Sequence, residues 1–360
     1  MEQRFQTILA GAFPNAKTRE NYASRLRGLV RNVGAGGLEE ILVEPSAWYR
    51  KIQAAYPSLA TRKNLLTAIL VLFREDAELA THAEAAGRWR KLHEDLGRHQ
   101  AARVRRSEPA DKQIAHYTSF EEIEAKYDAM KRGHPHTTRR ASLQFVLLSV
   151  IVHLRPKRAD LGAVLIVRGD RDPNRTDINY IVLRGKEATK EPTTKATGGS
   201  FLVMNLYKTS KYYQTVQEEL PPGLVTDIGT SLTRWPREYL FVKEDGEPMS
   251  NNTYTKFVQA TFADLFGRAT GVSLLRHIYI SEKLDFDNMT LEEQNAEAKL
   301  MLHTSGLQRQ YKWPKKVLCP KLCSDYVEAK KATTRRAPRA SGKRPTRRQA
   351  TSRRAEKEGF

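Results

Sequence analysis

The sequence predicts a mainly α-helical protein with a small antiparallel β-sheet. Apolar residues recur at three- and four-residue spacing over much of residues 18–152, which is typical of helices that bury one face. Two short runs rich in β-branched and aromatic residues, at 178–183 and 201–207, predict two strands joined by a long polar loop. With 360 residues, 40% of them hydrophobic, the chain can form two folded domains.

The formal net charge of +20 predicts a polyanionic partner, with nucleic acid favoured over a membrane surface. The longest apolar stretch, Phe145–Val152, is far shorter than the ~20 residues that cross a bilayer, and the first residues lack the apolar core of a secretory signal. We therefore expect an intracellular protein. Cys319 and Cys323 suit a reducing compartment as free thiols, because a lone pair does not make a zinc site.

The N-terminal third predicts a small helical bundle with a basic side. Thr18 is expected to cap a first helix, a second to cover 47–54, and Thr61 to open a third. A fourth helix is expected over 83–96, followed by a basic linker at 98–106 that suits a phosphate backbone. The arginines and lysines on the helix surfaces fit DNA contact or a solvated surface equally well. The domain boundary is placed at residue 106.

The second domain is expected to begin with a capping box at Ser119 and to continue with a long buried helix from Arg139 to Pro156. Three cations follow at that helix end: Arg155, Lys157 and Arg158. They form either an anion site for one phosphate, completed by a new helix after Asp160, or a solvated basic turn.

Lys208 follows the second predicted strand directly. A lysine there can either face water or protonate the leaving 5′ oxygen of a cleaved DNA strand as a general acid, and Lys211 is its competitor. Helices are then expected over 223–234 and 251–266.

The stretch 273–311 carries the residue types needed to attack a phosphodiester without a metal. Arg276 can hold a phosphoryl oxygen, His303 can donate to another, and Tyr311 offers a phenolate that leaves a covalent phosphotyrosine. His277 either takes part or packs as an ordinary helical side chain. Residues 285–299 read as a solvated acidic helix, and no cofactor or metal is expected, because no histidine or third carboxylate is fixed near Asp287 and Glu292.

Beyond Tyr311, residues 317–327 predict a short final helix and 329–360 a disordered basic tail, since the tail has almost nothing apolar to bury. The tail suits non-specific DNA binding or nuclear import equally well.

The motifs at Arg158, Lys208, Arg276 and Tyr311 together resemble those of the tyrosine recombinases. That family carries His-x-x-Arg-His, then Gly-His-x-Ser, then a tyrosine about nine residues later, with its lysine on a β-hairpin. The segment Leu154–Leu161 is similar to the Pro-Pro-Arg-Arg-x-Asp version found in recombinases of large DNA viruses and eukaryotic mobile elements.

The resemblance implies a site-specific recombinase or integrase that forms a 3′-phosphotyrosyl intermediate without metal or ATP. It implies a SAM-like core-binding domain at 1–106, a catalytic domain at 107–328, a homotetramer on two DNA duplexes and no membrane partner. It places the protein on DNA, in a host nucleus or at a viral replication site. The catalytic residues that it implies are Arg158, with Asp160 as its brace, Lys208, Arg276, His277, His303 and Tyr311.

Three departures from the family pattern leave alternatives open. Ser273 stands at the first histidine of the pattern, Leu302 at the glycine, and Tyr311 comes one residue early. The register of the first arginine could also fall on Arg155, or on Lys157. The rival functions are a type IB topoisomerase and a DNA-binding protein whose site has decayed.

Overall fold

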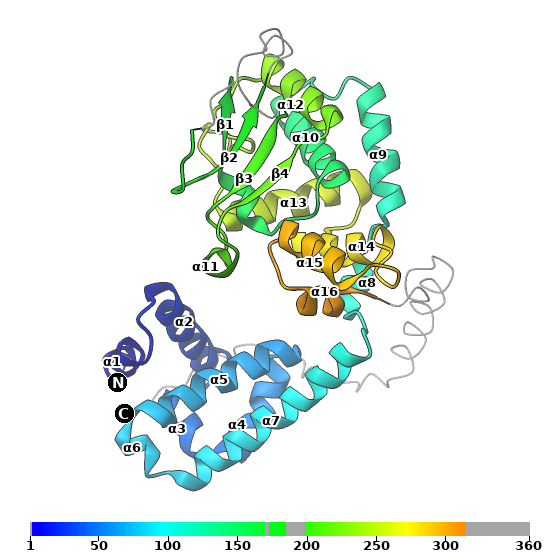
Figure 1. Cartoon of the computed structure of the whole chain (residues 1–360). Coiled ribbons are helices and arrows are strands. Elements are labelled where there is room, and N and C mark those ends of the chain that lie inside the picture. The colour runs from blue at the N-terminus through cyan, green and yellow to red at the C-terminus, as the bar shows by residue number, and fades with distance from the viewer. Residues whose placement is uncertain (1, 170–172, 185–198, 314–360) are drawn as a thin grey trace, which may run out of the picture. The chain divides into compact units, whose positions relative to one another are not determined.

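A computed structural model describes residues 2–169, 173–184 and 199–313 of the chain. In these ranges the protein is mainly helical with one four-stranded sheet, which confirms the predicted fold class (Figure 1). No helix in the described ranges is long and apolar enough to cross a membrane. The predictions for the helix at 317–327, the two cysteines, the tail and most of the loop between the two predicted strands fall outside the described residues.

The N-terminal part is a bundle of helices around one apolar core. Trp89 is the largest fully buried side chain of this core, and its indole N–H donates to the carbonyl of Leu42 at 2.9 Å. The central helix, α5, packs on both α2 and α7. The bounds are α1 (Glu2–Ala12), α2 (Ala16–Val33), α3 (Leu38–Val43), α4 (Pro45–Ala55), α5 (Leu59–Glu75), α6 (Ala77–Ala80) and α7 (Ala83–Arg105).

Two predicted helix starts were wrong, because side chains upstream cap the helices. The Asn15 side chain accepts a hydrogen bond from the backbone N–H of Thr18, and Ser58 does the same for Thr61. The predicted linker at 98–106 is helical as far as Arg105, within α7. The boundary at residue 106 stays a prediction.

The second part alternates helices with the strands of the sheet. The predicted capping box at Ser119 and the buried helix after Thr138 are confirmed, while a short 3₁₀ helix stands where a new helix was expected after Asp160. The helices are α8 (Asp111–Ala115), α9 (Phe120–Arg132), α10 (Arg139–His153), η1 (Ala159–Ala163), α11 (Ser210–Tyr213), α12 (Pro222–Arg234), α13 (Asn251–Phe266), α14 (Val272–Glu282), α15 (Leu291–Leu300) and α16 (Ser305–Tyr311).

The sheet has the order β1-β2-β3-β4 and is mixed, not purely antiparallel as predicted. The two predicted strands pair antiparallel, with Tyr180 opposite Val203, but the first strand pairs parallel to the second, with Leu165 opposite Tyr180. The strands are β1 (Val164–Arg168), β2 (Asn179–Leu183), β3 (Phe201–Met204) and β4 (Val216–Glu219).

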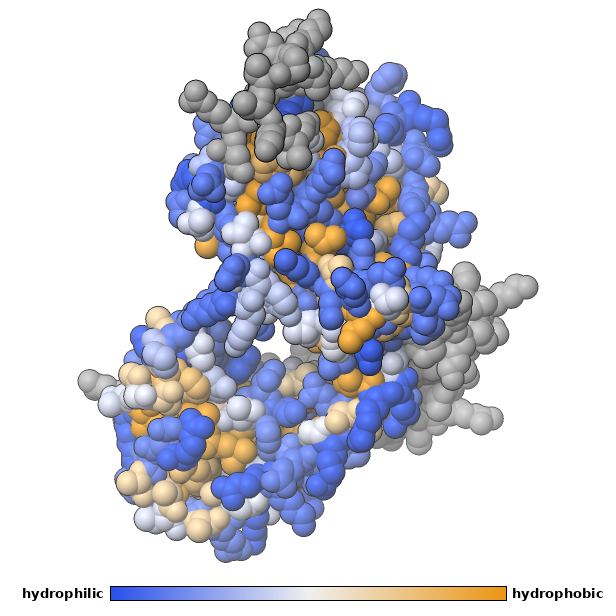
Figure 2. Space-filling model, in the orientation of Figure 1, coloured by the Kyte–Doolittle hydropathy of each residue, from blue (hydrophilic) through white to orange (hydrophobic). Residues whose placement is uncertain are grey.

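The C-terminal helices pack around α10 and the sheet. Helix α10 is buried along most of its length and packs on α9 and α12, while α13 packs on η1 and α15 on β4. Helices α14 and α15 both pack on α16, and the three lie together in yellow to orange in Figure 1. The face of the molecule seen in Figure 2 is mainly hydrophilic, with smaller hydrophobic areas between the polar side chains.

Candidate active site

Arg276 is a fully buried arginine on α14, and no carboxylate pairs with it in the described part of the chain. The helix forms because Leu274, Leu275 and Ile278 bury one face. Arg276 Nη2 donates to the carbonyl of Met301 at 3.2 Å, while Nε and Nη1 are buried without a partner. Burial lowers the pKa of Arg276 to about 10, so the guanidinium is still charged at neutral pH. A buried charge with two unused donors is arranged to receive an anion.

His303 lies against Arg276 as a neutral imidazole that can only donate. Its Nδ1 is 2.5 Å from Arg276 Nη2. Because a guanidinium has no acceptor, Nδ1 must accept and the proton of the neutral ring stays on Nε2. Nε2 is buried without a partner among the described residues. Burial, with the positive charges of Arg276 and Arg158, lowers the pKa of His303 to about 3, which keeps this form across the physiological range.

A tight turn after α15 brings His303 to this position. Leu302 has a φ of 59°, in the left-handed region that a leucine rarely adopts. The turn is closed by the backbone N–H of His303, which donates to the carbonyl of Ala298 at 3.0 Å. Met301 O, two residues before His303, is the carbonyl that holds Arg276, so one turn supplies two contacts to the guanidinium.

Tyr311 is the last residue of α16 and faces the same two side chains. The Thr304 side chain caps this helix by accepting from the N–H of Leu307 at 3.2 Å. The Arg276 guanidinium carbon is 5.0 Å from the centre of the Tyr311 ring, and the His303 ring centre is 5.6 Å from it. The predicted nucleophile is thus brought beside the predicted phosphate ligands.

His277 holds the backbone of Tyr311 in place. Its Nδ1 donates to the carbonyl of Tyr311 at 2.8 Å, and its ring stacks on Trp313 at 4.5 Å with an interplanar angle of 18°. The Trp313 backbone N–H donates to the hydroxyl of Ser281. Burial is the main cause that lowers the pKa of His277 to about 4. His277 is therefore well placed to orient the tyrosine segment.

The three cations after α10 differ in their partners. Arg155 forms a two-bond ion pair with Glu297, at 2.7 and 3.1 Å, and Lys157 is buried against Glu218. Arg158 makes no ion pair in the described part of the chain, and its charge acts on His303 and Arg276. Arg158 is thus the cation of the three that remains available to a phosphate.

Asp160 follows Arg158 but makes no ion pair with it. One carboxylate oxygen accepts from the Asn251 amide at 3.4 Å, and the other is buried without a partner. Burial raises the pKa of Asp160, and the positive charges of Arg158 and Arg276 oppose this shift. The direct brace that the resemblance implies is therefore not made among the described residues.

Lys208 lies in the connection between β3 and β4, exposed and without an ion pair to any described residue. The connection is held near the site at two points. Asn179, at the start of β2, binds the backbone of Asn205 and Leu206 and donates to the carbonyl of Asp160. The Thr209 hydroxyl donates to the carbonyl of Leu302, next to His303. Lys211, its competitor, is also exposed, on α11.

Two further predictions meet the structure near this site. Ser273 lies one turn before Arg276 on α14 and is exposed. The expectation of a solvated acidic helix at 285–299 was wrong for Glu297, whose side chain is only 17% exposed and pairs with Arg155. Asp287 instead pairs with Lys312, one residue after the tyrosine.

Sequence reasoning missed the residues that hold the site together. Asn179 was expected only as part of the strand at 178–183, and Trp313 was not singled out. The structure buries both, at 6% and 3% exposure. In the sequence, an asparagine at the start of a predicted strand is a usable signal, because asparagine is depleted in strands and its amide can bind the backbone. No signal in the sequence shows that Glu218 and Glu297 face cations far away along the chain.

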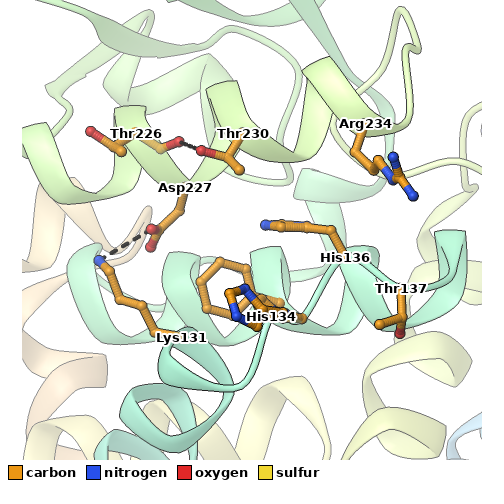
Figure 3. Close-up of a pocket in the computed structure, with 10 residues that line it drawn as sticks. Lys131, His134, His136, Thr137, Thr226, Asp227, Thr230 and Arg234 are labelled. Carbon is orange, nitrogen blue, oxygen red and sulfur yellow. Dashed lines mark hydrogen bonds and ion pairs between the residues drawn. The ribbon is translucent and has the colours of Figure 1, made fainter.

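A cavity of about 430 Å³ lies apart from these residues, and its lining contains none of the predicted catalytic residues (Figure 3). Asp227 at its wall pairs with Lys131 at 3.2 Å and also accepts from the hydroxyls of Tyr127 and Ser149. Within the described ranges, no group of three or more histidine, cysteine, aspartate or glutamate side chains could hold a metal ion.

Comparison with known proteins gives distant structural likenesses and no match in sequence. No family model and no curated protein matches the sequence. A solved structure of a XerA recombinase aligns with 94% of this chain and 100% of its own, at 12% identity and a TM-score of 0.35.

Proposed function

We propose that the protein is a site-specific DNA recombinase or integrase of the tyrosine type. The observation that carries this proposal is the buried Arg276, which keeps two unused guanidinium nitrogens beside the unused Nε2 of His303 and the ring of Tyr311. A tetrahedral phosphate offers several oxygens at once and satisfies such a set of donors. The neighbouring tyrosine supplies a nucleophile for the same phosphorus.

In this mechanism the hydroxyl oxygen of Tyr311 attacks a DNA phosphorus, and the bond to the 5′ oxygen breaks. Arg276, His303 Nε2–H and Arg158 stabilise the charge that builds up on the phosphoryl oxygens. The tyrosine proton leaves to water, because His303 is held as a donor and the pKa of His277 is about 4. Lys208 donates a proton to the leaving 5′ oxygen.

The product of this step is a 3′-phosphotyrosyl link and a free 5′-hydroxyl. Because the new phosphodiester conserves the energy of the old one, a second 5′-hydroxyl can reverse the reaction without ATP. Exchange between two duplexes requires two pairs of active sites, so the proposal includes a tetramer on DNA. It also places the protein where its DNA is, in a host nucleus or a viral replication site if the gene belongs to a virus or mobile element.

The test uses a pool of nicked duplexes with randomised sequence, incubated with the full chain in EDTA. Cleavage next to the nick releases a short strand, which traps the covalent intermediate. We expect a protein–DNA adduct that survives a denaturing gel and is absent with Tyr311→Phe. The absence of any adduct across the pool, or an adduct that needs added magnesium or zinc, would contradict the proposal.

A second assay separates recombination from strand swivelling. Duplexes with the sequences recovered from the adducts are supplied in pairs whose sequences match around the cleavage site. Strand exchange between them supports a recombinase, whereas relaxation of supercoiled DNA without exchange identifies a type IB topoisomerase.

A further inference from the structure

Lys157 is a fully buried lysine that binds the end of the helix leading into the active site. Its side chain has no exposed surface. The ammonium donates to a carboxylate oxygen of Glu218 on β4 and to the carbonyl of Leu300, the last residue of α15, at 2.5 Å. A cation at the C-terminus of a helix is favourable, because the last carbonyls have no partner within the helix.

The same lysine belongs to a network of four charges from three segments. Glu218 is 5% exposed, and its second carboxylate oxygen lies 3.7 Å from Arg155. Arg155 in turn pairs with Glu297 on α15, one turn before Leu300. The segment after α10 therefore holds α15 at two points through its two cations, while β4 supplies the carboxylate between them.

The residues directly after Leu300 make the contacts that arrange the active site. Met301 O accepts from Arg276, Leu302 O accepts from the Thr209 hydroxyl, and His303 Nδ1 accepts from Arg276. The turn at Leu302 has a strained left-handed backbone, which persists only where its surroundings hold it. The Lys157 contact lies immediately before this strained turn.

We propose that Lys157 is a positioning residue of the active site, which fixes the end of α15 so that His303 stays on Arg276 as an Nε2–H donor. This inference rests on the proposed function. It gives the buried lysine a role in the reaction beyond the stability of a buried ion pair.

A positioning role and a purely stabilising role of Lys157 predict a different pH dependence of the cleavage rate. The reason is that the charged groups that face His303 are positive and hold its pKa low. They are Arg276 from α14 and Arg158 from the segment after α10, and the uncharged ring of Tyr311 faces it from α16. The pKa of His303 responds to Arg276 and Arg158 and not to the four charges of the Lys157 network. If the turn relaxes, His303 leaves the guanidinium and its pKa rises from about 3 toward the usual value. Protonated His303 cannot accept from Arg276, so the rate should then fall in mild acid.

The experiment measures the rate of adduct formation on a trapped nicked duplex from pH 5.5 to 7.5. Lys157→Met alone leaves Glu218 buried without its closest cation and can lower folding stability. The double variant Lys157→Met with Glu218→Met replaces the pair by apolar side chains and keeps the fold, while still lacking the bond to Leu300 O. At each pH the rate of the double variant is divided by that of wild type. We expect this ratio to be about tenfold lower at pH 5.5 than at pH 7.5, because a histidine with a pKa near 6.5 is mostly protonated at the lower pH.

Asp227→Asn provides the matched control. Asp227 is also a buried carboxylate paired with a lysine, but it lies at the cavity of Figure 3 and contacts none of the predicted catalytic residues. We expect this variant to lose thermal stability and to keep the wild-type pH profile.

A double variant whose pH profile matches wild type would overturn the inference, whatever its thermal stability. So would an equal shift in Asp227→Asn, because the shift would then report general destabilisation. Either result leaves the proposed function intact as long as wild type forms the adduct. Failure of wild type to form any adduct would instead count against the proposed function itself.

Discussion

Arg276, His303 and Tyr311 lie next to one another at the centre of the site. Arg276 Nη2 donates a hydrogen bond to His303 Nδ1, and the guanidinium faces the ring of Tyr311. His277 Nδ1 donates to the backbone carbonyl of Tyr311. Three unused nitrogens therefore remain for a phosphate, Arg276 Nε and Nη1 and His303 Nε2, and the tyrosine hydroxyl has no hydrogen bond to another described residue.

Arg276→Ala tests the phosphate contact. Removing a preorganised charged donor should lower the cleavage rate about 10²- to 10³-fold and also weaken DNA binding. Arg140→Ala, which removes an exposed arginine paired with Asp264 on α13, should have a much smaller effect on the rate. The measurement is single-turnover adduct formation, and equal losses in both variants would contradict our assignment of the roles.

The two histidines predict how stability depends on pH. Their pKa values in the folded protein, about 4 for His277 and about 3 for His303, lie below that of an unfolded histidine near 6.5. The unfolded chain therefore binds more protons, and stability should fall by about 1.4 kcal/mol per pH unit for each histidine as the pH drops from about 6.5 to 4. Urea unfolding at several pH values measures this dependence. His303→Gln should lower the slope of the unfolding free energy against pH by the contribution of one proton, about 1.4 kcal/mol per pH unit.

For single residues, the sequence predicted which residue types form the site, but not which ion pairs they make. The motifs placed Arg276, His303 and Tyr311 together, and the structure does bring them together. The choice among Arg155, Lys157 and Arg158 could not be made from spacing, because it depends on Glu218 and Glu297, which approach only through the fold. Their catalytic roles stay predictions.

At the scale of elements, α16 is the short helix that carries the tyrosine. Its seven residues are too few to be stable alone, so its shape depends on the Thr304 cap and on packing against α14 and α15. Loss of the Thr304 cap should therefore loosen the whole helix, including its C-terminal end, where Tyr311 lies.

Thr304→Ala should cost about 1 kcal/mol of stability and slow adduct formation, because the helix that holds the nucleophile frays. Ser119→Ala, which removes the matching cap from α9, should cost a similar amount without slowing cleavage. Thermal unfolding and adduct rates are measured for both. If the two variants slow cleavage equally, α16 has no special dependence on its cap.

At the scale of the whole molecule, periodicity predicted most of the long helices and the fold class. The strands at 164–168 and 216–219 were missed, because a strand of four or five residues has little periodic signal and its pairing is set by distant partners. The parallel pairing of β1 with β2 likewise could not be read from an alternating pattern.

The basic tail gives a prediction for the complete chain. Deleting residues 330–360 should weaken DNA binding at low salt and flatten its salt dependence, by about 0.9 in the log–log slope for each phosphate that the tail neutralises. The adduct rate at saturating DNA should stay the same, since the tail follows Tyr311 by many residues. Titrations at several salt concentrations measure the slope, and an unchanged slope would show that the tail does not touch DNA.

The central claim is that Tyr311 becomes covalently joined to DNA. The direct measurement is mass spectrometry of the peptide that remains attached to a trapped strand after protease digestion. We predict that the nucleotide is joined through its 3′ phosphate to Tyr311. We also predict that Tyr311→Phe yields no linked peptide and binds DNA as wild type does. A nucleotide linked to Tyr279, Tyr326, Tyr212 or Tyr213, or an adduct that persists in Tyr311→Phe, would contradict this claim.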